Sequence, residues 1–140
     1  MKTLELRWAT RERHAQQRFL DFIVSGRSLY EELRRRGGDY VSCLGWLADP
    51  HDARARARLV LEQKGDLPNG RVSLFICPEC GDLGCGAVTA TIVRDGADIV
   101  WTEVGHASGT DGTFHPFDRL GPFRFREADY RRAVLAIPRS

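Results

Sequence analysis

The chain has 140 residues, of which 42% are hydrophobic, so it can build one core without disulfides or metals. Its 21 basic and 19 acidic residues leave a net charge of +2, which argues against the strongly basic balance of many nucleic-acid-binding proteins. No run approaches the roughly 20 apolar residues of a membrane span, and residues 1–8 lack the apolar run of a signal peptide. We therefore expect a single domain over residues 1–140, located in the cytoplasm and without a membrane partner.

Residues 4–8 and 19–24 have the patterns of two β-strands. The first segment alternates apolar and polar residues, as a strand with one buried face does, and the second is an apolar run of strand length. Together they predict a hairpin that turns within residues 10–17.

Two signals predict helices in the following segment. Ser28 and Glu31 form a capping box, in which the serine oxygen accepts a hydrogen bond from the glutamate amide and the glutamate reaches back to the serine. This box predicts a helix over residues 29–36. The Asp-Pro pair at 49–50 predicts a second helix, with the aspartate as N-cap, that continues to Lys64.

Six arginines in these two helices raise the question of a nucleic-acid surface. They are Arg34, Arg35, Arg36, Arg54, Arg56 and Arg58. Alternation spreads the last three around their helix, and no aromatic residues for base stacking are interleaved with them. We therefore predict that they form a solvated face and that nucleic acid is not a partner.

A period of two begins at Arg71 and predicts antiparallel strands. Apolar residues alternate over 72–76 and again over 88–92, and the Asp-Gly pair at 95–96 is typical of a tight hairpin turn. The return strand then includes residues 99–101. The intervening cysteine-rich segment is expected to join two neighbouring strands.

The C-terminal residues predict a short strand and then a helix. Phe123 and Phe125 have the spacing of one strand face. The helix carries an apolar face at i, i+3, i+4 and i+7 that consists of Tyr130, Ala133, Val134 and Ile137. The predicted fold is α+β, with a single antiparallel β-sheet packed by two or three helices.

Three of the four cysteines lie within nine residues and indicate a metal site. Cys77-x2-Cys80 followed by Gly81 has the form of a zinc knuckle, and Cys85 supplies a third thiolate. Candidates for the fourth ligand are Cys43, His51, His106 and His115. We rank His106 first because it follows the return strand of the predicted hairpin. An ordinary zinc ribbon has a second Cys-x2-Cys pair, which this chain lacks.

The same spacing is found in thiol oxidoreductases, whose first cysteine lies at a helix N-terminus. Here the glycine-rich residues 81–86 are a poor helix, and the carboxylates of Glu79 and Asp82 would raise a thiol pKa. A thioredoxin-like mechanism is therefore disfavoured. The remaining interpretation is a tight structural connection, with free thiols or a disulfide between Cys80 and Cys85.

Residues 80–85, Cys-Gly-Asp-Leu-Gly-Cys, carry a resemblance that covers roughly the second half of the chain. With Trp101 and the Leu-Gly-Pro-Phe segment at 120–123, the chain resembles a group of small bacterial proteins, frequent in actinobacteria, that have a Cys-Gly-Asp-x-Gly-Cys core. The resemblance implies no established activity. In size and in their α+β class, such proteins are similar to the immunity and accessory proteins of bacterial toxin systems.

No nucleophile elbow, phosphate-binding loop or His-Glu-x-x-His helix is present in the sequence. Residues 66–103 are locally acidic, and we expect Glu79 and Asp82 to bind a partner. We predict a non-enzymatic protein-binding module, with a toxin as one candidate partner and no cofactor. The alternative is a zinc-binding or thiol-dependent protein that uses Cys77, Cys80, Cys85 and His106.

Overall fold

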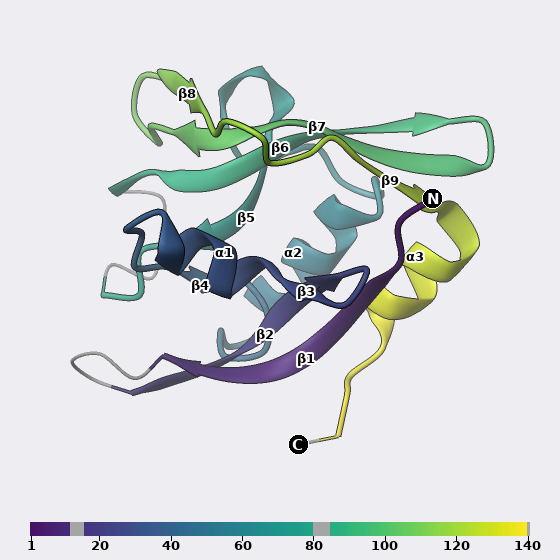
Figure 1. Cartoon of the computed structure of the whole chain (residues 1–140), viewed down its shortest axis with the longest axis horizontal. Helices are drawn as coiled ribbons and strands as arrows, with labels where there is room; N and C mark the ends of the chain where they lie inside the picture. The colour runs from purple at the N-terminus through teal and green to yellow at the C-terminus, as the bar shows by residue number, and fades with distance from the viewer. Residues whose placement is uncertain (12–15, 80–84, 140) are drawn as a thin grey trace.

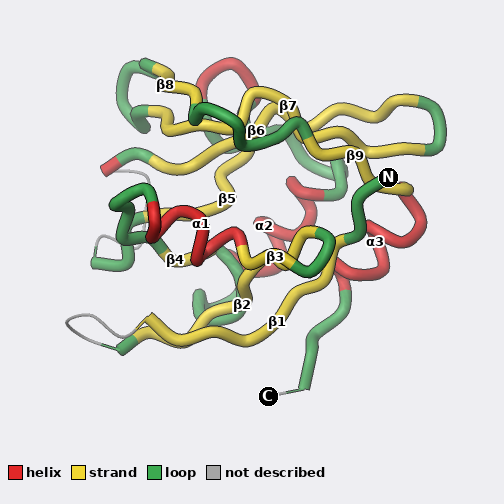
Figure 2. Tube along the Cα trace, viewed as in Figure 1, coloured by secondary structure: helices red, strands yellow, loops and turns green. Residues whose placement is uncertain are grey.

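The computed structural model describes residues 1–11, 16–79 and 85–139, which form two antiparallel sheets and three helices (Figures 1 and 2). The first sheet has the order β1-β2-β3, with bounds Leu4–Arg11, Gln17–Val24 and Arg27–Ser28. Its hairpin pairs Leu4 with Val24 and Arg11 with Gln17. The hairpin predicted from the alternation in the sequence is therefore present.

The second sheet contains six strands in the order β4-β5-β6-β7-β8, with β9 also paired to β7. Their bounds are Val41–Ser42, Val72–Ile76, Ala87–Asp95, Asp98–Ala107, Phe114–Pro116 and Phe123–Arg126. β6 and β7 form the hairpin predicted from the Asp-Gly pair, with Asp95 opposite Asp98. A short 3-10 turn at Pro68–Gly70 precedes β5.

The α+β class is confirmed, but the prediction of a single sheet is wrong. β2 meets the second sheet near Leu20, whose amide donates to the carbonyl oxygen of Leu44 at 2.9 Å. This contact does not extend into continuous strand pairing between β2 and β4, because β4 has only two residues and the chain turns away at Gly45, where φ is +94°. Alternation in a sequence predicts a strand and its buried face but does not identify the strand beside it.

Helix α1, Leu29–Arg35, begins as the sequence predicted. The Oγ atom of Ser28 accepts a hydrogen bond from the Glu31 amide at 3.0 Å. The Glu31 carboxylate does not complete the capping box, since it accepts hydrogen bonds from Arg34 instead. The Ser28 hydroxyl also donates to the buried Asp21 carboxylate at 2.5 Å. Burial raises the pKa of Asp21 to about 6, despite these hydrogen bonds to its charged form.

Helices α2, His51–Leu59, and α3, Glu127–Leu135, are shorter than predicted. Asp49 does not cap α2, whose N-cap position is Pro50 without a side-chain hydrogen bond. The helix ends before Lys64 because Leu61 adopts a left-handed conformation with φ of +64°. Ile137 lies beyond α3 and is 76% exposed, so it is not part of the buried face.

The core lies between the two sheets and is closed by the helices. Figure 1 shows the β1–β2 hairpin below, the β6–β7 hairpin above and α3 at the right. Trp101 is fully buried at the centre of this core, and its indole N–H donates to the Tyr130 hydroxyl at 3.0 Å. That hydroxyl donates in turn to the carbonyl oxygen of Leu59 at 2.7 Å. One hydrogen-bonded chain therefore links β7, α3 and α2.

The second helix also corrects the prediction of a solvated arginine face. Arg56 is 7% exposed, and its Nη1 atom donates to the carbonyl oxygens of Val134 at 2.6 Å and Ala136 at 2.8 Å. Its Nε atom donates to Asp52 at 2.8 Å. Arg56 therefore satisfies carbonyl groups at the C-terminal end of α3 that the helix itself leaves unpaired.

In the described part of the chain, no helix combines the length and hydrophobicity needed to cross a lipid bilayer.

Candidate functional site at the cysteine loop

The predicted cysteine site lies at one end of the six-stranded sheet. Val41 pairs with Ile76, and Ile76 pairs with Ala87. Their chain neighbours Tyr40, Cys77 and Gly86 therefore lie in the next row, at the edge where β5 leaves the sheet and β6 enters it. Cys80 and Asp82 of the predicted site fall outside the described residues.

His106 lies beside this row. It is on β7, opposite both Val88 of β6 and His115 of β8. A side chain at Gly86 would collide with it, because an ideal Cβ there would be 2.6 Å from His106 Cε1 and 2.8 Å from Nε2. The imidazole therefore occupies the space left by the glycine next to Cys85. The Tyr40 ring is also close, with its centroid 6.3 Å from that of His106.

The described cysteines differ in accessibility. Cys85 is exposed, Cys77 is half-buried and Cys43 is buried. Burial raises the pKa of the Cys43 thiol to about 12, and its Sγ atom lies 3.5 Å from the Ser73 hydroxyl oxygen. Cys43 is therefore a neutral core residue and a poor candidate for a fourth thiolate ligand. Burial, with a smaller contribution from Cys77, raises the pKa of Tyr40.

The described residues do not by themselves form a metal site. Across residues 1–11, 16–79 and 85–139, no three His, Cys, Asp or Glu side chains converge as metal ligands. His51 is the first residue of α2 and belongs to neither sheet. The sequence-predicted set thus includes two neighbours of Gly86, namely Cys85 and His106, together with Cys77 in the same row.

A buried arginine holds two carboxylates at this end of the molecule. The Arg11 side chain is 3% exposed, and its Nε and Nη2 atoms donate to the two oxygens of Asp39 at 2.9 and 2.7 Å. Its Nη2 atom also lies 3.6 Å from the Glu79 carboxylate. The hydrogen bond to Asp39, together with both negative charges, raises the pKa of Arg11 above its ordinary value.

This arrangement, here called the Arg11 clamp and consisting of Arg11, Asp39 and Glu79, joins three chain segments. They are the end of β1, the loop between α1 and β4, and the start of the cysteine loop, which lie at the same end of the molecule (Figure 1). Glu79 remains 69% exposed and Asp39 38% exposed, so both carboxylates reach the surface. Arg11 and Asp39 were not among the residues predicted from the sequence, because neither belongs to a motif that points to the other.

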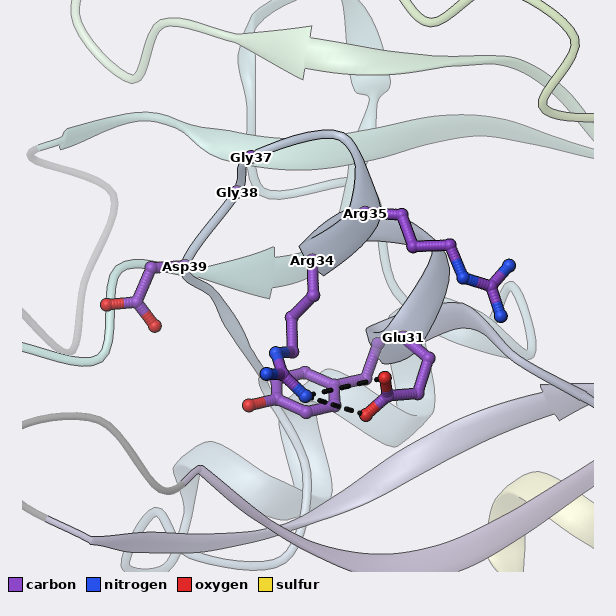
Figure 3. A pocket seen from close by; sticks show the side chains of 7 residues that line it. Glu31, Arg34, Arg35, Gly37, Gly38 and Asp39 are labelled. Carbon is purple, nitrogen blue, oxygen red and sulfur yellow. Dashed lines mark hydrogen bonds and ion pairs between the residues drawn. The ribbon is translucent and has the colours of Figure 1, made fainter.

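A groove of about 250 Å³ lies next to the clamp, along α1 (Figure 3). Its lining includes Gly37, Gly38 and Asp39. The Arg34 guanidinium lies 5.8 Å from the centroid of the Tyr30 ring and donates to Glu31 at 3.1 Å. In Figure 3 the Asp39 side chain is directed away from that ion pair.

The groove wall therefore presents paired charges, whereas the clamp presents two accessible carboxylates.

Comparison of the chain with protein-family models, curated protein sequences and solved structures gave no match.

Proposed function

We propose that the protein is a non-enzymatic binding module that recognises a basic segment of another protein through the carboxylates of Asp39 and Glu79. The observation that carries this proposal is the Arg11 clamp, in which a nearly inaccessible guanidinium fixes two surface carboxylates. An exposed ion pair on its own adds little to stability. A buried cation that holds its acidic partners at the surface instead fixes the position of negative charge.

Two hydrogen bonds from Arg11 order the Asp39 carboxylate before a partner arrives, which lowers the entropic cost of binding. The positive charge of Arg11 also attracts Glu79, whose carboxylate lies 3.6 Å away. Glu79 is 69% exposed, so its carboxylate is accessible to a second cation. Asp82 belongs to the same acidic loop in the sequence, and we retain it as a partner-binding residue on that ground. A lysine or arginine side chain of the partner would form ion pairs with these carboxylates.

The proposal predicts that Glu79→Lys weakens capture of the partner by about tenfold or more, because it places a cation beside Arg11 and repels a basic segment. Partners would be identified by mass spectrometry after photo-crosslinking from the neighbouring position 78, which leaves Glu79 in place, and the purified partner would be titrated against each variant. The matched control is Glu5→Lys, since Glu5 is 60% exposed and pairs with Arg7 at the opposite end of β1.

Unchanged affinity in the Glu79→Lys variant, or an equal loss in the Glu5→Lys variant, would contradict the proposal. A melting curve for each variant separates lost binding from lost folding. The narrower proposal is that the partner is a toxin encoded beside this gene. Co-expression with the neighbouring product tests it directly: the wild-type chain should restore growth and Glu79→Lys should not.

A second candidate function is zinc binding, which the position of His106 against Gly86 favours. It predicts roughly one zinc ion per chain by elemental analysis and slow reaction of Cys77 and Cys85 with a thiol reagent until a chelator is added. Cys43 should stay unreactive in the folded protein with or without metal, because it is buried. Metal-free protein with a normal melting temperature, and no change on Cys80→Ser, would exclude this function.

A further inference from the structure

A second and larger cleft, of about 910 Å³, lies beside the N-terminal part of α1. Its walls come from the β2–β3 turn, from the beginning of α1 and from the segment that leads into β9. Figure 2 shows these parts facing one another across the front of the molecule. The cleft shares Glu31 and Arg35 with the smaller groove but contains neither Asp39 nor Glu79.

Cationic side chains dominate the polar lining of this cleft. The four cations are Lys2, Arg27, Arg35 and Arg119. Arg35 is paired with Glu32 at 3.1 Å, and Arg119 is 90% exposed with Asp118 as a neighbour at 4.0 Å. Lys2 and Arg27 make no salt bridge within the part of the chain that the structure describes.

The two acidic residues of the cleft are already engaged. Glu31 accepts hydrogen bonds from Arg34, and Glu32 accepts them from Arg35 and Arg36. The negative charges of Glu31 and Glu32 are therefore offset by neighbouring arginines. The positive charges of Lys2 and Arg27 have no such ion-pair partner among the described residues. The cleft carries an excess of positive charge that a ligand can neutralise.

Apolar side chains form the facing wall. Leu120 and Phe123 are half-buried against the core, and Pro122 between them is exposed. The backbone there adopts left-handed conformations at Arg119 and Gly121, with φ of +57° and +84°. A Cβ at Gly121 would be 3.2 Å from the side chain of Val104, so glycine allows the segment to lie close to the sheet.

We propose that this cleft binds an acidic peptide segment that also carries apolar side chains. Carboxylates of the peptide would pair with Lys2 and Arg27, and its apolar residues would contact Leu120 and Phe123. The volume lies within the range of about 300–1,000 Å³ typical of ligand sites. The apolar wall favours a peptide over a nucleic acid, because Phe123 is half-buried against the core and does not offer a free ring face on which a base could stack.

The test is fluorescence anisotropy with a labelled seven-residue peptide of alternating glutamate and leucine. The charge-reversal variant Lys2→Glu/Arg27→Glu is expected to bind this peptide at least about tenfold more weakly than the wild type. Arg54→Glu is the matched control, because Arg54 is an exposed arginine of α2 that does not line the cleft. A peptide with glutamine in place of glutamate should bind as weakly as the acidic peptide binds the charge-reversal variant.

Equal binding by the wild type and the charge-reversal variant would overturn the proposal, as would equal binding of the glutamine peptide. Tighter binding of a seven-nucleotide single-stranded DNA than of the peptide would assign the cleft to a nucleic acid instead. The milder variant Lys2→Gln/Arg27→Gln should give an intermediate loss, and its melting temperature verifies folding. None of these outcomes depends on Glu79, so the test is independent of the proposed function.

Discussion

Replacing Trp101 with alanine is expected to lower the free energy of unfolding by about 4 kcal/mol, the usual range for deleting a fully buried large aromatic side chain. Trp101 is 0% exposed, and its ring contacts Phe22 at 5.5 Å and Phe125 at 5.2 Å between centroids. The truncation would leave a cavity between the sheets and remove the hydrogen bond to Tyr130. Urea denaturation followed by circular dichroism measures the change.

Two smaller substitutions separate packing from hydrogen bonding at this position. Trp101→Phe keeps an aromatic ring but removes the indole N–H, and Tyr130→Phe removes the hydroxyl that joins Trp101 to Leu59. Each is expected to cost about 1–3 kcal/mol, because a buried polar group loses its partner. A Trp101→Ala variant as stable as Tyr130→Phe would show that the ring contributes little to the core.

Arg56→Ala is expected to destabilise the protein by about 3 kcal/mol. The substitution removes the donor to the carbonyl oxygens of Val134 and Ala136 and leaves Asp52 without its ion-pair partner. The loss should appear in thermal and urea unfolding alike. It also predicts earlier hydrogen exchange in α3 than in the wild type, since the C-terminal end of that helix loses its contact with α2.

The control for Arg56 is provided by the same helix. Arg54→Ala changes an exposed arginine two residues away and is expected to alter stability by no more than about 0.5 kcal/mol. Equal effects of the two substitutions would mean that helix propensity, and not the buried hydrogen bonds, accounts for the loss.

Local signals in the sequence predicted the local elements. Ser28 begins α1, the Asp-Gly pair turns the β6–β7 hairpin, and the spacing of Phe123 and Phe125 identifies β9. These predictions succeeded because a cap or a tight turn is determined by residues close together in the chain. The Asp-Pro signal at 49–50 correctly predicted a helix but not its cap: Asp49 does not cap α2, and the Asp52 side chain within the helix instead accepts a hydrogen bond from the Gly45 amide of the preceding turn.

Contacts between distant segments were not predictable in the same way. The division into two sheets depends on which strand edges meet, and the burial of Arg56 depends on where α3 ends. The candidate site shows both cases. The sequence identified the cysteine loop and His106, whereas Arg11 and Asp39 required the fold to bring them together.

The Arg11 clamp also makes two surface carboxylates dependent on one cation. Because one guanidinium contacts both Asp39 and Glu79, a cation that competes for Glu79 changes the charge balance felt by Asp39 and by the end of β1. Through these two contacts, Arg11 connects the end of β1 to the loop after α1 and to the entrance of the cysteine loop, three segments that are far apart in the sequence. Loss of the Arg11 side chain would therefore remove contacts from all three segments at once.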